Sequence, residues 1–337
     1  MKSLQEDNES LSKFRFFLAI ACLALTVACS ATRSSERSQT NQTESQAWNR
    51  KNHLESGSRP SLPETLRDWP PVGRYTFERD SLPDLRVFFT VPKGSDSRTP
   101  ILIVVPGALR NAKSYRDEWR HLSEANRFIT LVLEGTREDY PTEYEYNAGG
   151  VLTPEGELTD PKNWLFHAIE PLFDDFKARY GSERKRYSLY GHSAGGGFVH
   201  RFMLFVPQAR VDSAVAANPA FFTIPSTPKD SQPAPYPFGC HGAGLPQGAI
   251  ALWFNRPLTI LLGERDTGPR TKPLSNGPLA RAQGPSVYAR GLQFYRSALA
   301  VAAEQDLALR WQLNVVPFVG HSNVHMASHA VPLLFTE

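Results

Sequence analysis

The amino-acid sequence predicts an α/β fold in which a mostly parallel central sheet is covered by helices on both faces. Short, continuously apolar runs recur from residue 100 to the end of the chain, as in strands that are buried on both sides. Segments with the apolar spacing of amphipathic helices separate these runs, and such alternation is typical of parallel sheets. The chain has 337 residues, of which 41% are hydrophobic, which is enough for one large domain with appendages.

Each expected strand is an apolar or alternating run that is bounded by turn residues. The first two runs are joined by a turn that contains Pro83 and Asp84. The expected strands are Arg74–Arg79, Leu85–Val91, Ile101–Val105, Phe128–Glu134, a short run that begins at Tyr187, Val211–Ala217, Leu258–Leu262 and Arg310–Val316.

Each expected helix carries apolar residues at intervals of three or four. In the first of them, Tyr115, Trp119 and Leu122 would share one face. The expected helices are Ser114–Asn126, Trp164–Tyr180, a glycine-rich helix after Ser193, Ser286–Glu304 and Asn323–Ala330.

The segment Gly191–Gly195 has the pattern G-x-S-x-G, between an apolar strand-like run and a helix-compatible run. The pentapeptide alone occurs by chance, but this context is that of a nucleophile elbow, in which a serine sits on a strained turn between strand and helix. Glycines are needed there because side chains would collide with the neighbouring strand and helix. Ser193 is therefore the candidate nucleophile.

A serine hydroxyl is a weak nucleophile and needs a base, which a carboxylate in turn orients. The chain order expected with this elbow is serine, acid, histidine, each after a strand. Asp266 follows the buried run Leu258–Leu262 and is the candidate acid, with Glu264 on the same loop as the alternative.

His321 follows the last expected strand and is the candidate base. His325 and His329 follow it at helical spacing, so a metal-binding helix face is an alternative interpretation. The segment from His321 to His329 contains no acidic residue, unlike the H-E-x-x-H pattern, and we therefore expect no metal and no cofactor.

Two backbone N–H groups should stabilise the negative charge that develops on the substrate oxygen. Ala194, directly after the candidate nucleophile, supplies one of them. The other is expected after Ile101–Val105, where Gly107 allows close approach of the backbone. Ala108 is the candidate there and Leu109 the alternative.

Aromatic residues gather in two long segments that could line a substrate site. One is the loop before residue 150, and the other is a Pro- and Gly-rich insertion at about 221–256, which we interpret as a short cap. Core packing explains such aromatics equally well, and His192 could be purely structural. The candidate substrate contacts are Tyr144, Tyr146, His192, Tyr236 and Phe238.

The N-terminus has the features of an export signal. Lys13 and Arg15 precede an apolar run that is too short to span a bilayer. The run ends at Cys29, as in a bacterial lipoprotein signal, so residues 1–29 would be a signal peptide and Cys29 the lipidated residue. Cleavage near Ala31 is the alternative. We expect an exported protein, anchored in the bacterial envelope or secreted.

Residues 30–70 are polar and predict a disordered linker, so that the folded domain would span residues 71–337. The net charge of +3 and the absence of a basic block with interleaved aromatics argue against binding to nucleic acid. Of the three cysteines, only Cys240 lies in the expected domain, which excludes a disulfide within it.

Several of these stretches resemble the α/β-hydrolase superfamily from about residue 71 to the end. The similar stretches are Pro106–Ala108, Tyr190–Gly197, Leu261–Asp266 and Val319–His321. Within the superfamily, the elbow continued by Phe198–Phe202 and the segment Pro235–Gly239 are similar to exported poly(3-hydroxybutyrate) depolymerase-like esterases and predicted lipoprotein hydrolases.

This resemblance implies an α/β-hydrolase fold and ester hydrolysis more firmly than it implies a substrate. We therefore expect an exported serine esterase that forms an acyl-enzyme on a small or oligomeric ester. The alternatives are a peptidase or amidase with the same residues, and a non-catalytic binding protein on this scaffold. Metal-dependent hydrolysis through the three C-terminal histidines is a fourth possibility.

Overall fold

The computed structural model describes residues 69–80, 82–226 and 231–335. All of these belong to the compact unit Leu62–Glu337, and the expected signal peptide, Cys29 and nearly all of the expected linker lie outside the described residues. Within the described ranges, no helix is long and apolar enough to span a bilayer.

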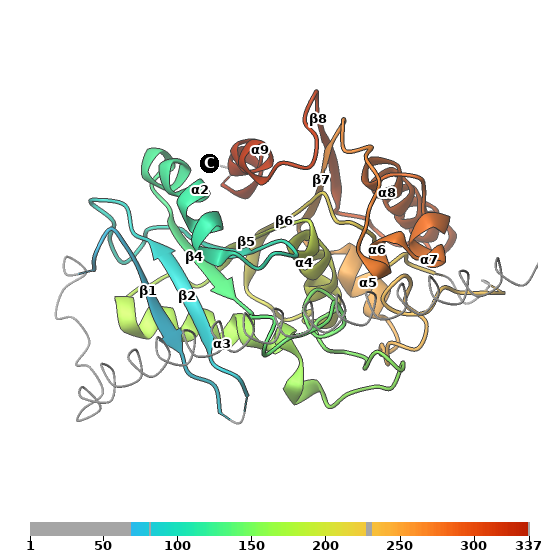
Figure 1. Ribbon diagram of the computed structural model, residues 1–337, viewed down its shortest axis with the longest axis horizontal. Helices are drawn as coiled ribbons and strands as arrows, with labels where there is room; N and C mark the ends of the chain where they lie inside the picture. The colour runs from blue at the N-terminus through green and yellow to red at the C-terminus, as the bar shows by residue number, and fades with distance from the viewer. Residues whose placement is uncertain (1–68, 81, 227–230, 336–337) are drawn as a thin grey trace, which may run out of the picture. The chain divides into compact units, whose positions relative to one another are not determined.

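The core of the domain is an eight-stranded sheet with the order β1-β2-β4-β3-β5-β6-β7-β8 (Figure 1). Strand β2 is antiparallel to both β1 and β4, and the remaining neighbours are parallel. The strands are β1 (Val72–Phe77), β2 (Leu85–Thr90), β3 (Ile101–Val105), β4 (Ile129–Glu134), β5 (Tyr187–His192), β6 (Val211–Ala217), β7 (Leu258–Gly263) and β8 (Gln312–Val316).

The strand predictions are confirmed, with small shifts at the ends. Strands β3 and β6 have the predicted bounds, whereas β1 begins at Val72 and β8 begins only at Gln312. Because β3 and β5 to β8 are parallel, their carboxyl ends meet at one edge of the sheet. Functional sites of open α/β sheets are built at this edge.

Helices cover both faces of the sheet. On one face lie α2 (Ala112–Asn126) and α9 (Asn323–Leu334), which pack together. The other face carries α3 (Ile169–Tyr180), α4 (Ala194–Phe205) and α8 (Val287–Glu304), so the sheet separates α2 and α9 from α3 and α4 (Figure 1).

Alternate side chains of the strands feed two separate hydrophobic cores. On β3, Ile103 and Val105 belong to the core beneath α3, α4 and α8, whereas Leu102 and Val104 belong to the core beneath α2 and α9. Every residue of β3 is buried, which explains its unbroken apolar run. These two cores hold the sheet edge on which the candidate site is built.

The predicted helix Trp164–Tyr180 is shorter than expected. Leu165–Ala168 forms a separate 3₁₀ turn, η3, after the extended Trp164, and α3 begins only at Ile169. A second short 3₁₀ turn, η2 (Pro161–Asn163), precedes it, and the Asp160 side chain caps its first turn.

In its described residues, the segment interpreted as a cap contains one helix that the sequence did not predict. This helix is α5 (Ala249–Phe254), whose Trp253 side chain is buried in the core. Two further unpredicted helices, α6 (Pro273–Asn276) and α7 (Pro278–Ala282), follow β7, each beginning at a proline. They are too short to show a helical apolar period.

Candidate active site

Ser193 lies on the turn between β5 and α4 in a strained backbone conformation, with φ of 59° and ψ of −118°. The turn is possible only because its neighbours lack side chains. A Cβ at Gly191 would collide with the Gly195 carbonyl, and a Cβ at Gly195 would collide with the Val105 carbonyl of β3. The G-x-S-x-G spacing therefore reflects contacts with backbone atoms that cannot move aside.

Ser193, His321 and Asp266 form one hydrogen-bonded chain. The Ser193 Oγ lies 2.8 Å from His321 Nε2, and His321 Nδ1 lies 2.6 Å from Asp266 Oδ2. With Nδ1–H donating to the carboxylate, Nε2 is left to accept the serine proton. Asp266 is buried (2% exposed), whereas the His321 side chain is 27% exposed, so the chain runs from the protein interior to the surface.

The alternative acid, Glu264, has a different partner. Its carboxylate accepts the Phe318 N–H at 2.8 Å and is exposed to solvent. Asp266 is held differently: its second oxygen, Oδ1, forms an ion pair with Arg270. The arrangement thus places Asp266, and not Glu264, behind His321.

His325 and His329 lie on the exposed side of α9. His329 Nδ1 donates to the His325 carbonyl at 2.9 Å, a bond within the helix. Among the residues that the structure describes, no three His, Cys, Asp or Glu side chains are grouped so that they could hold a metal ion. These two histidines therefore take no part in the hydrogen bonds that join Ser193, His321 and Asp266.

The two expected N–H donors lie on either side of the candidate nucleophile. Ala194 is the first residue of α4, where helical N–H groups have no partner within the helix. Ala108 lies in the loop after β3, and a Cβ at the preceding Gly107 would be only 3.4 Å from Ser193 Cβ. Within the described part of the chain, no backbone hydrogen bond uses the N–H of Ala108 or of Ala194.

Most of the aromatic side chains predicted to contact substrate are instead in the core. Tyr146 is buried with its hydroxyl on the Pro106 carbonyl, and Tyr236 is buried with its hydroxyl on the Ala148 carbonyl. Phe238 is also buried, and Tyr144 is partly exposed. Tyr146 affects the site indirectly, because its hydroxyl holds the loop that carries Ala108.

His192 is buried beside the site rather than open to solvent. Its ring centroid lies 4.7 Å from that of His321, and its Nδ1 lies 3.1 Å from the Tyr115 hydroxyl. Burial, and to a lesser extent the neighbouring His321 and Arg270, holds the His192 pKa well below its usual range. His192 is therefore neutral at the elbow.

Sequence reasoning missed Asn218, which joins three strands at the site. Its side chain donates to the Gly320 carbonyl at 3.1 Å and accepts the Gly263 N–H at 2.8 Å, so it ties the loops of His321 and Asp266 together. Asn218 is fully buried and has a positive φ of 45°, a conformation that asparagine tolerates better than most residues. Its position between the strand Val211–Ala217 and Pro219 was the one signal in the sequence that could have marked Asn218 as part of the site.

Buried arginines hold the loops around the site. Arg201 is fully buried and donates to the carbonyls of Asn147, Gly197 and Pro237, and burial lowers its pKa to about 10. Arg110 lies over the Tyr146 ring, 4.2 Å from its centroid, and donates to carbonyls of the 135–142 loop. These guanidinium groups fasten the aromatic loop to the sheet.

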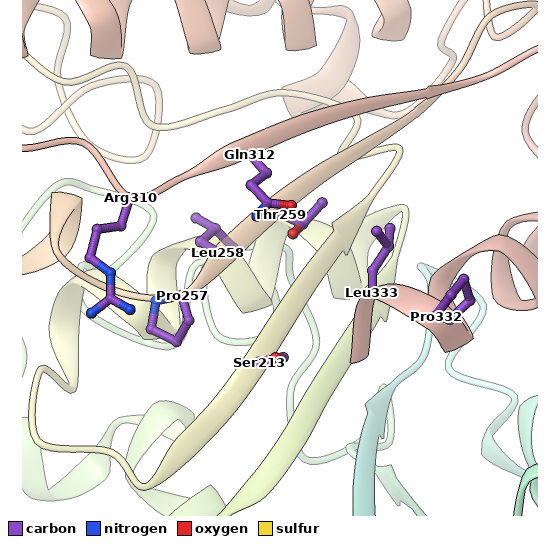
Figure 2. Close-up of a pocket in the computed structure, with 8 residues that line it drawn as sticks. All are labelled: Ser213, Pro257, Leu258, Thr259, Arg310, Gln312, Pro332 and Leu333. Carbon is purple, nitrogen blue, oxygen red and sulfur yellow. The ribbon is translucent and has the colours of Figure 1, made fainter. Parts of the chain in front are cut away.

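A pocket of about 200 Å³ lies at the opposite edge of the sheet (Figure 2). It opens beside Leu258 and Thr259, the first residues of β7, whereas the candidate site is at the other end of that strand. The pocket contains none of the residues of the hydrogen-bonded chain. It is lined by Ser213, Pro257, Leu258, Thr259, Arg310, Gln312, Pro332 and Leu333.

No protein-family model matches the chain, and no curated protein matches it. Solved structures do match the chain. Poly(aspartic acid) hydrolase-1 from Sphingomonas sp. KT-1 is 37% identical, with a TM-score of 0.74 over 79% of this chain and 98% of that one. LpqC, a poly(3-hydroxybutyrate) depolymerase from Bordetella parapertussis, is 29% identical, with a TM-score of 0.72 over 78% of this chain and 90% of that one.

The siderophore hydrolase EstA from Aspergillus nidulans shares the fold at 11% identity, with a TM-score of 0.50 over 82% of this chain and 97% of that one. The sheet order, the elbow and the likeness to poly(aspartic acid) hydrolase-1 over nearly its whole length agree with one another. The resemblance noted from the sequence is thereby confirmed, and the chain is a hydrolase that belongs to the α/β-hydrolase superfamily.

Proposed function

We propose that this protein is a serine hydrolase that cleaves carboxylic esters through an acyl-enzyme. The observation that carries the proposal is the continuous chain of two short hydrogen bonds, 2.8 Å from Ser193 Oγ to His321 Nε2 and 2.6 Å from His321 Nδ1 to Asp266 Oδ2. Such a chain is what a hydroxyl nucleophile needs, because the base must be both within reach and held in the right tautomer.

The reaction follows from this geometry. Ser193 Oγ attacks the ester carbonyl carbon while its proton passes to His321 Nε2, and Asp266 stabilises the imidazolium that forms. When the tetrahedral intermediate collapses, the bond to the leaving alcohol breaks and His321 protonates that oxygen. Water then attacks the acyl-enzyme, gives its proton to His321, and releases the acid as Ser193 recovers its proton.

The negative oxygen of the intermediate would lie between the N–H groups of Ala194 and Ala108. Both are backbone donors on the two sides of Ser193, and neither is used by another backbone group in the described residues. The dipole of α4 adds a partial positive charge at the same place. Removal of one such donor in comparable enzymes costs about 3 kcal/mol of transition-state stabilisation.

Two exposed apolar side chains on the loops of the site support an apolar acyl or alcohol group. Leu109, next to Ala108, is 76% exposed, and Phe318, on the loop of His321, is 72% exposed. Phe318 is also held in a positive-φ conformation (61°), which is a strained backbone for a bulky residue.

Amide hydrolysis is the second candidate, and one observation favours it. The 37% identical structure is a hydrolase of poly(aspartic acid), a polymer whose units are joined by amide bonds. The same nucleophile, base and acid can cleave either linkage, because both reactions pass through a tetrahedral oxyanion. Comparison of matched p-nitrophenyl ester and p-nitroanilide substrates separates the two.

We also propose that the protein is exported and anchored in the bacterial envelope through lipidated Cys29, or secreted after cleavage near Ala31. The proposal rests on the basic and then apolar N-terminal sequence that ends at Cys29. A Cys29→Ser variant that remained in the membrane fraction would contradict lipid anchoring.

The enzymatic proposal is tested by hydrolysis of p-nitrophenyl esters from acetate to decanoate by the full-length protein and by Ser193→Ala. We expect turnover by the wild type, with an acyl preference visible across the series, and none above background in the variant. Near-wild-type turnover in Ser193→Ala would refute it. A folded wild type that neither turns over esters nor reacts with a fluorophosphonate probe would favour a binding protein.

A further inference from the structure

The loop that carries Ala108 is held through the backbone carbonyls of residues 106–108. The Pro106 carbonyl accepts the Tyr146 hydroxyl at 2.8 Å, and the Gly107 carbonyl accepts the Arg110 N–H at 2.9 Å. The Ala108 carbonyl accepts Arg137 Nη2 at 2.6 Å. Each anchor fixes the orientation of a peptide group, so the position of the unused Ala108 N–H depends on these contacts.

The loop also touches the Tyr115 hydroxyl at Gly107. Tyr115 is buried on α2, and its oxygen would lie only 2.8 Å from a Cβ placed at Gly107. This close approach is possible because residue 107 is glycine. The Tyr115 hydroxyl therefore packs directly against the residue that precedes Ala108.

The Tyr115 hydroxyl has a second partner in the elbow itself, His192 Nδ1, at 3.1 Å. Burial raises the pKa of the phenol, so Tyr115 keeps its proton. The His192 imidazole is neutral, because burial, and to a lesser extent the neighbouring His321 and Arg270, lowers its pKa. The hydroxyl is therefore hydrogen-bonded to the elbow on one side and in contact with Gly107 on the other.

We propose that Tyr115 is a positioning residue that sets the second oxyanion donor, by clamping Gly107 on the β3–α2 loop to His192 on the nucleophile elbow. This inference rests on the proposed serine mechanism. One hydroxyl thereby fixes the distance between the two segments that supply Ala108 and Ala194. Without the Tyr115 hydroxyl, the loop keeps its other three anchors but loses the contact that fixes its position relative to Ser193.

The first test is Tyr115→Phe, which removes the hydroxyl and keeps the ring in the core. Because a small misplacement of a donor weakens only the transition state, we expect kcat to fall about tenfold or more, with KM nearly unchanged. The affinity of an alkyl boronic acid, which forms a tetrahedral adduct on the serine, should weaken by the same factor. A purely structural role would lower the melting temperature without this split.

Tyr187→Phe is the matched control, because Tyr187 is also buried and its hydroxyl donates to Glu170 at 2.6 Å, at the far end of β5 from Ser193. The control should retain the wild-type kcat and boronic acid affinity. An equal loss of kcat in both variants would overturn the proposal, since the effect would then not belong to the clamp.

The second test uses Gly107→Ala, whose new methyl group would meet the Tyr115 oxygen at 2.8 Å, its other neighbours being at 3.4 Å or more. Alone, this variant should lower kcat at constant KM, so it also tests the clamp if Tyr115→Phe does not fold. In the Tyr115→Phe background the added methyl group should cost little, because the oxygen is gone. Independent, multiplicative losses would overturn the proposal, as would an unchanged kcat in Gly107→Ala.

Fluorophosphonate labelling separates failure of the inference from failure of the mechanism. A folded wild type that does not react with the probe would overturn the serine mechanism and the clamp with it. A wild type that reacts, beside a Tyr115→Phe variant with the same kcat and the same rate of labelling, would overturn the clamp alone.

Discussion

The replacement Asp266→Asn tests the hydrogen-bonded chain most severely, because the carboxylate serves two donors at once. His321 Nδ1–H donates to Oδ2, and Arg270 donates to Oδ1. An amide has one acceptor oxygen and one NH₂ group, so it can satisfy only one of these donors. The charged guanidinium is the stronger competitor for the single oxygen.

The NH₂ group of the variant would then face His321 Nδ1 and stabilise the tautomer with the proton on Nε2. That nitrogen lies 2.8 Å from Ser193 Oγ in the wild type and could no longer accept its proton. The same change of tautomer costs about 10⁴-fold in kcat in a well-studied serine protease, or about 5.5 kcal/mol. We expect a loss of this size, with the fold retained.

Arg270 provides a second step. In Asp266→Asn with Arg270→Met, the amide oxygen is released to accept the His321 Nδ1–H, which restores the productive tautomer. The double variant should be about tenfold or more faster than Asp266→Asn alone, although slower than the wild type because the negative charge is missing. Such recovery by a second deletion is not expected from additive damage.

The assay is kcat/KM on p-nitrophenyl butyrate with the concentrations of folded, purified enzyme taken from absorbance. Glu264→Gln is the matched control, since it makes the same chemical change on the same loop and can still accept the Phe318 N–H. Its activity should stay close to the wild type. Activity above a tenth of wild type in Asp266→Asn, or a double variant no faster than the single one, would refute this reasoning.

Three further predictions concern stability and reactivity. Burial lowers the pKa of His192 and His200 well below the usual range, so the unfolded chain binds more protons in acid than the folded chain does. Below about pH 6.5, the free energy of unfolding should therefore fall by up to 1.4 kcal/mol per pH unit for each of the two histidines. Urea titrations of His200→Gln should show a smaller fall with decreasing pH. Burial raises the pKa of Cys240 to about 12, so native protein at pH 8 should alkylate there far more slowly than unfolded protein, as mass spectrometry would show; rapid native labelling would contradict this. Gly195→Ala should lose about 3 kcal/mol or more of stability, because its methyl group collides with the Val105 carbonyl, and an unchanged melting temperature would disprove that contact.

Much of the fold was predictable because its signals are local and strong. The apolar run of β3 is buried on both faces, and the spacing of Tyr115 and Trp119 on α2 matches one buried helix face. The elbow was predictable for a related reason. A side chain at Gly191 or Gly195 would collide with backbone atoms, so the turn requires glycines at fixed positions close to Ser193 in the sequence.

The contacts that depend on distant segments could not be predicted. Asn218 joins the ends of β7 and β8, and the position of an asparagine says nothing of those partners until the sheet order is known. The same holds for Arg270 on Asp266 and for Tyr115 at the elbow. The sequence predicts Tyr146 and Tyr236 as substrate contacts, but their hydroxyls donate to buried carbonyls, which sequence composition does not reveal.

The most direct test of the central claim is to trap the acyl-enzyme. Full-length protein is mixed with excess p-nitrophenyl butyrate, quenched in acid within seconds, digested and analysed by mass spectrometry. We predict a butyryl group on Ser193, together with a burst of p-nitrophenol, and neither in Ser193→Ala. Full turnover by the wild type without a burst and without an acyl group on Ser193, or turnover that persists in Ser193→Ala, would contradict the proposed mechanism.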